Sequence, residues 1–307
     1  MIELTFLGTV NGIPSRERNH PAIALEYYGE NKETILLDCG EGTQKQLTLA
    51  SISFMKIDKI FITHWHADHF AGLIPLLATM NLEKRTKPLK IFAPDAERFV
   101  SNILDIGYFG VRFPVEAIDV SYEGDEITKI DDAEEYEVFS IPVLHTVPAV
   151  AYCFKEKDRW NIDLEKIKKL GMRRGAWMKK LKRDGVAEFQ GKKVKIESVA
   201  KVSPGLKVVY TGDTRPCDTV VKISEHADVL IHDATFLEGD EEVRGKAHAH
   251  ADVKQAGKIA ERANVKQLIL TNISRRYKDA SEIEKEAKKA FKNVKVAYDL
   301  MRVKVKN

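Results

Sequence analysis

The sequence lacks the features that would place the protein in a membrane or send it out of the cell. No apolar run approaches the roughly 18 residues of a membrane-spanning helix. The first residues, Met1–Leu7, alternate as a strand does and lack the charged-then-apolar order of a signal peptide. We therefore expect a soluble, cytoplasmic protein with no membrane partner.

Cysteine is also scarce, with three residues at positions 39, 153 and 217. Their number is odd and no Cys-x-x-Cys spacing occurs, so they predict neither a disulfide framework nor a thiolate zinc site. We expect three reduced thiols, most of them buried, and no disulfide partner.

Apolar residues, in contrast, make up 44% of the 307 residues, which is enough for a substantial core. In the first half, short strands such as Ala22–Tyr28 and Thr34–Asp38 form a hairpin pattern. In the second half, strands alternate with helices. This pattern favours the α/β class, with sheets covered on the outside by helices.

Four potential metal ligands lie within six residues in the stretch His64-Trp65-His66-Ala67-Asp68-His69. An apolar β-branched run precedes them and an apolar helix is predicted to follow, so they occupy a turn at the end of a strand. Loops at strand ends are where α/β proteins place their chemistry. Each of these polar groups would cost about 1–3 kcal/mol if buried without a partner, and a metal ion would satisfy them together.

Further candidate ligands also follow predicted strands. His145 comes after the strand Tyr136–Ile141, and Asp213 follows the apolar run that begins at Lys207. Asp38 ends another strand, where it could either orient neighbouring ligands or cap the helix that follows. His250 precedes a predicted helix, and we assign the nearby His248 to the surface.

Imidazole and carboxylate ligands suit zinc, with manganese or iron as a second choice. The candidates are too many for one catalytic ion and about right for two that share a carboxylate. Two ions clamp a phosphodiester and lower the pKa of a water molecule between them. From the residues alone we predict a hydrolase with one or two metal ions that acts on nucleic acid.

A basic stretch supports that substrate. The net charge of the chain is +3, but Glu165–Asp184 alone holds nine Lys or Arg against two acids. Such a concentrated patch, with Trp160 and Trp177 close by, is typical of a nucleic-acid-binding arm. The stretch is short and poor in apolar residues, so we expect an excursion from the main domain that buries no core of its own.

The chain resembles the metallo-β-lactamase superfamily and, within it, the ribonuclease Z family of endonucleases that remove 3′ trailers from precursor tRNA. The motifs that carry the resemblance extend over the whole length of the chain: Leu7-Gly8-Thr9, the loop Pro14–Asn19, Asp38–Gln44, His64-x-His66-x-Asp68-His69, His145, Tyr210–Pro216, His250-Ala251-Asp252, and Ser274-x-Arg276-Tyr277. The resemblance implies an αββα four-layer sandwich: one domain over residues 1–307 with a flexible arm inserted at 155–197.

The resemblance also implies the roles of individual residues. His64, His66 and His145 would hold one of two zinc ions. Asp68 and His69 would hold the other, and Asp213 would bridge the two. Asp68 would also act as the base on the attacking water, and His250 would protonate the leaving 3′ oxygen or stabilise the transition state.

Partners follow from the same resemblance: precursor tRNA as substrate, and a second copy of the chain in a homodimer. We expect the tRNA to contact the Pro14–Asn19 loop, the arm and the Ser274–Tyr277 stretch. The predicted RNA-binding residues are Arg16, Arg18, Asn19, Arg173, Arg174, Lys179, Lys180, Lys182 and Arg276.

One ligand position departs from the family pattern, which has histidine where this chain has Asn272. Asparagine offers only a neutral carbonyl oxygen, so Asn272 could ligate a harder ion such as Mn²⁺, or the second site could be weak or empty. Asn272 could also be a substitution, natural or introduced, that cripples the enzyme. The arm departs from the family as well, with Gly175-Ala176 in place of a Gly-Pro pair. Two alternative functions remain: the altered arm favours a related ribonuclease with a different RNA preference, and Asn272 favours an RNA-binding homologue with little catalysis.

Overall fold

The computed structural model describes residues 1–106, 110–239, 249–277 and 280–306. The chain divides into two compact units. The first comprises Met1–Lys155 and Leu206–Asn307, and the second comprises Glu156–Gly205. The second unit is thus continuous in sequence, and the first is formed by the chain on either side of it.

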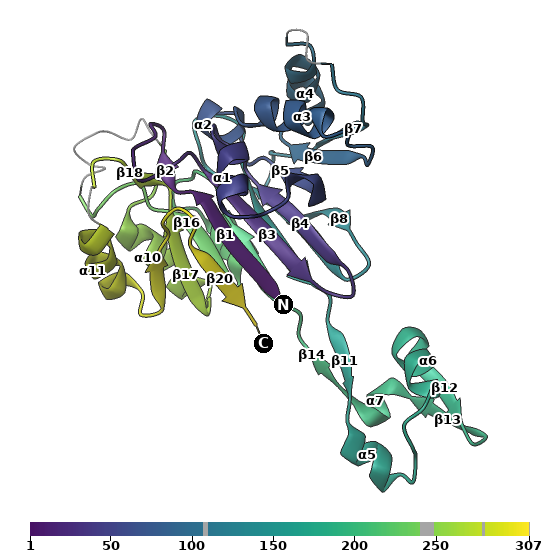
Figure 1. The fold of residues 1–307 in the computed structure, drawn as a ribbon. Coiled ribbons are helices and arrows are strands. Elements are labelled where there is room, and N and C mark those ends of the chain that lie inside the picture. Colours follow the sequence, from purple (N-terminus) through teal and green to yellow (C-terminus); the bar gives the residue numbers. More distant parts are fainter. Residues whose placement is uncertain (107–109, 240–248, 278–279, 307) are drawn as a thin grey trace. The chain divides into compact units, whose positions relative to one another are not determined.

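Two seven-stranded sheets form the framework of the first unit (Figure 1). In spatial order, the first sheet consists of β20 (Arg302–Val305), β1 (Ile2–Gly8), β3 (Ala22–Tyr28), β4 (Lys32–Leu37), β5 (Ile57–Phe61), β6 (Leu89–Ala93) and β7 (Val115–Asp119). The second consists of β19 (Val294–Val296), β17 (Gln267–Thr271), β16 (Val229–Asp233), β15 (Lys207–Tyr210), β10 (Val150–Glu156), β9 (Tyr136–Pro142) and β8 (Thr128–Asp132).

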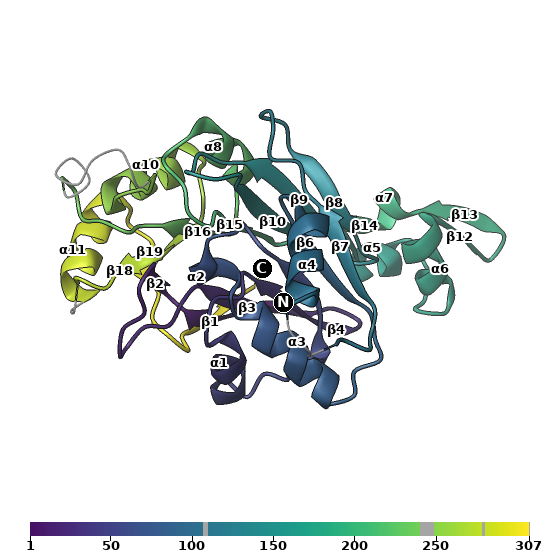
Figure 2. The same cartoon turned by 90° about the horizontal axis from the view of Figure 1, so that it is seen from above.

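Helices cover the outer faces of both sheets. On the first sheet they are α1 (Thr43–Leu49), the 3-10 turn η1 (Phe54–Lys56), α2 (Ala67–Phe70), α3 (Leu73–Leu82) and α4 (Ala96–Leu104). On the second sheet they are α8 (Asp218–Ser224), α10 (Val253–Arg262) and α11 (Ala280–Ala290). Seen from above, α8 and α10 lie beside the adjacent strands β9, β10, β15 and β16 (Figure 2).

Strand alternation explains why the layers assemble in this way. In β1, the side chains of Ile2, Leu4 and Phe6 enter the core between the two sheets, whereas Leu7 packs with the helices outside the first sheet. Both faces of β1 are covered, since all of its residues are buried, including the polar Glu3 and Thr5. The predicted αββα four-layer sandwich is confirmed.

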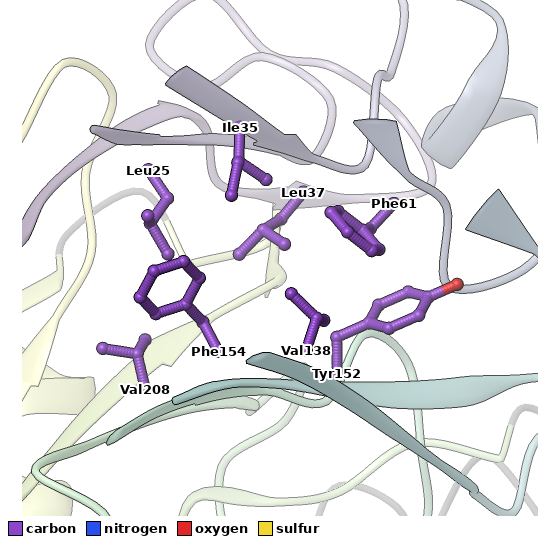
Figure 3. Close-up of a pocket in the computed structure, with 8 residues that line it drawn as sticks. All are labelled: Leu25, Ile35, Leu37, Phe61, Val138, Tyr152, Phe154 and Val208. Carbon is purple, nitrogen blue, oxygen red and sulfur yellow. The ribbon is translucent and has the colours of Figure 1, made fainter. Parts of the chain in front are cut away.

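The core between the sheets contains a small void of about 10 Å³ (Figure 3). The first sheet contributes Leu25, Ile35, Leu37 and Phe61 to its lining, and the second contributes Val138, Tyr152, Phe154 and Val208. A space this small and this apolar offers a water molecule no polar partners. The interior of the sandwich is therefore structural, and the chemistry must lie at the strand ends.

The strand order brings several chain segments to one edge of the sandwich. Strands β4 to β7 are parallel to one another, as are β15, β16, β17 and β19. Loops after parallel strands collect at the same sheet edge. A short parallel ladder between β2 (Val10–Asn11) and β18 (Ile273–Ser274) joins the two halves of the chain there.

The second unit has a small core of its own. It consists of β11 (Arg159–Ile162), α5 (Leu164–Lys169), α6 (Trp177–Asp184), β12 (Val186–Phe189), β13 (Lys192–Lys195), α7 (Ile196–Val199) and β14 (Ala200–Ser203). Ile167, Leu181 and Val194 are buried together inside it. The expectation that this stretch buries no core is therefore wrong, because apolar residues that are sparse in sequence meet across its two antiparallel strand pairs and its helices.

The few cysteines and the lack of long apolar runs led to two predictions about the structure. Cys39, Cys153 and Cys217 are free thiols, and the first two are buried. In the described part of the chain, no helix is long and apolar enough to cross a membrane. The cytoplasmic location stays a prediction from the sequence.

Candidate metal centre

The cluster His64 to His69 lies where β5 gives way to α2. His66 is the N-cap residue of α2, and Asp68 and His69 are in its first turn. The turn packs closely against the end of β4, where a Cβ atom on Gly40 would lie 2.2 Å from the carbonyl oxygen of Asp68. Glycine at position 40 thus allows the backbone to approach closely enough to fix the cluster.

Three imidazole rings from two loops form a first group. The Nδ1 atom of His66 lies 3.1 Å from Nε2 of His64 and 3.0 Å from Nε2 of His145. His145 is held in turn by the carbonyl oxygen of Ala249, 3.1 Å from its Nδ1. The loop between β9 and β10 therefore delivers His145 to the cluster, as its place after a strand predicts.

Asp213 lies between this group and a second group, which contains Asp68 and His69. Its Oδ2 is 3.9 Å from Nε2 of His64 and 4.0 Å from Nε2 of His145. Its Oδ1 is 3.1 Å from Nε2 of His69, which lies 3.7 Å from Oδ2 of Asp68. The preceding Gly212 adopts a φ of 59°, a conformation that L residues disfavour. The carboxylate of Asp213 thus faces both groups: its Oδ2 faces the first group and its Oδ1 faces the second.

Asn272 completes the second group. Its side chain is 2% exposed, and its Nδ2 donates a hydrogen bond to Oδ1 of Asp213. Its Oδ1 is buried without a hydrogen-bond partner among the described residues. Its backbone has a φ of 62°, which asparagine tolerates better than most residues. A buried carbonyl oxygen without a partner, on a side chain that contacts Asp213, is suited to bind a cation.

These donors fit metal ions. Ligand atoms of His64, His66 and His145 lie within 4.8 Å of one another, and so do those of His64, His69 and Asp213. Nitrogens that bind one zinc ion tetrahedrally at 2.0–2.1 Å are about 3.3 Å apart. His69 Nε2 is fully buried and makes no aligned hydrogen bond with any residue that the structure describes, which leaves it available as a ligand. The prediction of a metal-binding site is therefore supported by two adjoining donor sets.

Asp38 orients the second group from behind. It is fully buried, with a φ of 55°, and its Oδ1 accepts a hydrogen bond from the backbone N–H of Thr63 at 2.7 Å. Its Oδ2 accepts from Nδ1 of His69 at 2.7 Å and from the hydroxyl of Tyr210 at 2.7 Å. The alternative role as a helix cap is excluded, because Gly42 is the N-cap of α1.

Electrostatically, the second group favours positive charge. Burial opposes protonation of His69, but the carboxylates of Asp213 and Asp38 raise its pKa well above the usual range. Burial dominates at His64, whose pKa falls well below its usual range. Asp213 keeps its charge in spite of burial, because His69 and His250 hold its pKa low. A cation bound among these groups would replace protons as their counter-charge.

Family models match two parts of the chain. The model of the anti-Pycsar protein Apyc1 matches residues 2–107, and the model of the beta-lactamase superfamily domain matches residues 188–273. Among curated proteins, Ribonuclease Z of Thermococcus sibiricus is 44% identical over 91% of this chain and 88% of its own length. Ribonuclease Z of Methanothermobacter thermautotrophicus is 41% identical over 100% of this chain and 97% of its own.

The chain belongs to the ribonuclease Z family. Solved structures agree with that assignment. Human tRNase Z, short form, is 26% identical, with a TM-score of 0.71 over 99% of this chain and 100% of its own. The metallo-beta-lactamase fold protein YhfI from Bacillus subtilis, at 20% identity and a TM-score of 0.68 over 98% of each chain, shares the fold.

In this ribonuclease Z homologue, His250 is held by a residue that sequence reasoning did not single out. Nδ1 of His250 lies 2.8 Å from Oδ2 of Asp233, the last residue of β16. Burial opposes the charge on His250, but Asp233 and Asp213 raise its pKa to about 9. The amide of Asn11 lies 3.4 Å from its Nε2. An aspartate at a strand end was the available signal for Asp233, as it was for Asp38 and Asp213.

The predicted RNA-binding residues differ in their surroundings. In the second unit, Arg173, Arg174, Lys179, Lys180 and Lys182 are all exposed. In the first unit Arg16 is exposed, whereas Arg18 and Asn19 are partly buried and hydrogen-bonded to the protein. Arg276 is partly buried, and its guanidinium lies 5.0 Å from the centre of the Phe236 ring. His248 lies outside the described residues.

Proposed function

We propose that this protein is a metal-dependent endoribonuclease that cuts precursor tRNA at its 3′ end and releases the trailer. One observation carries the proposal: two groups of metal-ligand side chains share Asp213, and His250 lies 3.8 Å from that shared carboxylate. This arrangement suits hydrolysis of a phosphodiester, with attack on one side and departure on the other. The Ribonuclease Z name of the relatives supports precursor tRNA as the substrate.

We assign the ligands of two zinc ions as follows. His64, His66 and His145 would hold the first ion. Asp68, His69 and the carbonyl oxygen of Asn272 would hold the second, and Asp213 would be shared between the two sites. Zinc ions bound there supply a clamp for the phosphate and lower the pKa of an attacking water. The ligand atoms of His64, His66 and His145, which lie within 4.8 Å of one another, support the first site. The second site is supported by Nε2 of His69, which lies 3.1 Å from Oδ1 of Asp213 and 3.7 Å from Oδ2 of Asp68.

The protein's own side chains then handle the protons. Oδ2 of Asp68 accepts a hydrogen bond from the backbone N–H of Gly12 at 2.9 Å, which fixes the orientation of the carboxylate. It is the base that takes the proton of the attacking water. His250 is oriented through Nδ1 by Asp233, so its other nitrogen is the one that delivers a proton to the leaving 3′ oxygen.

Asn272 makes the second site richer in oxygen than the first. The first site offers three imidazoles and one carboxylate oxygen, whereas the second offers three oxygens and one imidazole. Harder ions such as Mn²⁺ prefer oxygen ligands, and zinc prefers imidazole to a neutral carbonyl. We therefore propose that the second site binds zinc weakly and accepts Mn²⁺.

The second unit serves as the arm that grips the tRNA. We propose that it is an insertion in a single catalytic domain. Its five exposed predicted contacts on and before α6 are all basic. Exposed lysine and arginine side chains bind phosphates and release counterions, which makes the binding depend on salt. A homodimer, in which the arm of one subunit serves the other, is part of the same proposal.

A cleavage assay tests the proposal. The protein is incubated with precursor tRNA and with an unstructured RNA of equal length, in zinc and in manganese, and the products are mapped to single nucleotides. We expect one cut after the discriminator base of the precursor tRNA and little cleavage of the unstructured RNA. Equal cleavage of both RNAs would indicate a different RNA preference. Tight binding without cleavage in either metal would contradict an enzymatic function.

A further inference from the structure

One segment of the first unit touches both residues assigned to proton transfer. Gly12 donates its backbone N–H to Asp68, and the amide of Asn11 lies 3.4 Å from Nε2 of His250. The same segment continues into the loop that ends at Asn19 and carries the exposed Arg16. We define segment 9–19 as this stretch of chain, and loop 13–19 as its second half.

The two halves of segment 9–19 are fastened in different ways. The first half is held by the ladder between β2 and β18, in which Val10 pairs with Ile273, and by the N–H of Ile273, which donates to the carbonyl of Thr9 at 2.9 Å. Loop 13–19 lies beyond that ladder, and its tip is a compact turn that begins at Ser15, whose N–H donates to the carbonyl of Arg18 at 2.9 Å. The first half thus has its own attachment beside the metal site.

Thr9 and Asn19, the two ends of segment 9–19, form the neck of the loop, and both bind a carboxylate from the other end of the chain. Asp299 Oδ1 accepts the hydroxyl of Thr9 at 2.8 Å, and its Oδ2 accepts the backbone N–H of Asn19 at 2.7 Å. Nε2 of Gln46, in α1, also donates to Oδ2, at 2.9 Å. Both ends of segment 9–19 are therefore tied to one side chain that lies 280 and 290 residues away in the sequence. This side chain adds to the backbone N–H groups of Thr9 and Val10, which donate to the carbonyl of Asn19 at 2.9 and 3.1 Å.

Arg18 supplies the counter-charge inside this neck. Its Nη1 donates to the hydroxyl oxygen of Thr9 at 2.6 Å and to the carbonyl of Ala297 at 2.7 Å. A carboxylate and a guanidinium that are partly removed from water need each other as compensation. The guanidinium of Arg18 is thus directed into the protein, and Arg16 is the arginine that the loop leaves exposed.

We propose that Asp299 is a positioning residue for RNA binding: it closes the neck of loop 13–19 on Thr9 and Asn19 and so holds Arg16 in place to contact the RNA backbone. The inference rests on the proposed function, because it takes RNA as the ligand of the loop. It assigns Arg18 to the neck, where it acts through Asp299 and Thr9. Since the ladder with β18 holds the first half, the loss of Asp299 should loosen RNA binding and leave the metal site intact.

The test compares Asp299→Asn with the wild type on a large and a small substrate. We expect the Kd and KM for precursor tRNA to rise about tenfold, the loss expected for one charge-assisted hydrogen bond. Hydrolysis of bis(p-nitrophenyl) phosphate, which has no RNA body to grip, should change less than twofold. Metal content per chain should stay the same. A general structural defect would lower all of these readouts together.

Two further variants sharpen the result. Thr9→Val removes a donor to Asp299 with little change in volume, and it should raise the same Kd in the same direction. Asp218→Asn makes the same chemical change at an exposed ion pair with Arg262 and should alter nothing. An unchanged Kd in both neck variants would overturn the inference, and so would an equal loss of activity on both substrates. If the wild type cuts no RNA, the proposed function fails, and the Kd values still decide the role of Asp299.

Discussion

Replacing Asp38 by asparagine should remove His69 as a metal ligand while the fold survives. In the wild type, Oδ2 of Asp38 accepts a hydrogen bond from Nδ1 of His69, which leaves Nε2 of the ring free to face Asp213. In the variant, the carbonyl oxygen can keep the bond from the N–H of Thr63, and the NH₂ group then takes the place of Oδ2. An NH₂ donor requires Nδ1 to accept, so the ring proton moves to Nε2 and blocks its lone pair.

The magnitude follows from the hydrogen bonds that Asp38 makes. Loss of such an outer partner typically lowers metal affinity 10- to 100-fold. The cost in stability is about 1 kcal/mol, since the hydroxyl of Tyr210 can rotate to accept from the new NH₂ group. Asp38→Ala is the wrong variant, because it leaves the buried donors of Thr63, His69 and Tyr210 without a hydrogen-bond acceptor. At about 1–3 kcal/mol each, their loss approaches the total stability of a typical protein.

The assay is a metal titration of wild type and Asp38→Asn against a chelator of known affinity, combined with urea unfolding. We expect one of two bound ions to weaken 10- to 100-fold. Tyr210→Phe is the matched control: it removes another hydrogen bond to the same oxygen, which also accepts from the hydroxyl of Thr63, so it should lower stability by about 1 kcal/mol and leave metal affinity within twofold. If Asp38→Asn keeps both affinities within twofold, the tautomer reasoning is refuted.

Three other predictions follow from named contacts. Asn272→His should raise the zinc retained per chain after gel filtration, because imidazole is a better zinc ligand than a carbonyl oxygen; unchanged zinc content would contradict the role given to Asn272. The combined change of Lys179, Lys180 and Lys182 to Ala should reduce the salt slope of log Kd for precursor tRNA by roughly 2–3, and an unchanged slope would exclude phosphate contacts by these lysines. Burial raises the pKa of Asp299 from 3.8 to about 6, so this group stabilises the fold below pH 3.8 and the effect is lost as the pH rises through 6. The difference in unfolding free energy between wild type and Asp299→Asn should therefore fall by roughly 2–3 kcal/mol from pH 4 to 7, and parallel pH profiles would refute this.

Much of the site could be predicted from the sequence, because its ligands follow buried strands. His64 follows β5, His145 follows β9 and Asp213 follows β15, and each strand is marked by an apolar run. Once parallel strands are predicted, their ends must share an edge. The resemblance to a family then divided the ligands between two metal ions, which spacing alone could not do.

Other features depend on contacts that no local pattern encodes. Asp233 resembles any aspartate at a strand end, and only the fold brings it to His250. Arg18 and Arg16 are two residues apart in a polar loop, yet Arg18 alone is held in the neck, by the hydroxyl of Thr9 and the carbonyl of Ala297. The core of the second unit joins residues as distant as Ile167 and Val194, so it has no periodic signal in the sequence.

The most direct test of the metal centre is a crystal of the protein grown with zinc and measured with anomalous diffraction at the zinc edge. We predict two peaks about 3.5–4 Å apart, on either side of Asp213. The stronger peak should lie among His64, His66 and His145, and the weaker one beside His69 and Asn272. No peak at either position, or a single peak remote from Asp213, would contradict the assignment of these residues to a shared metal centre.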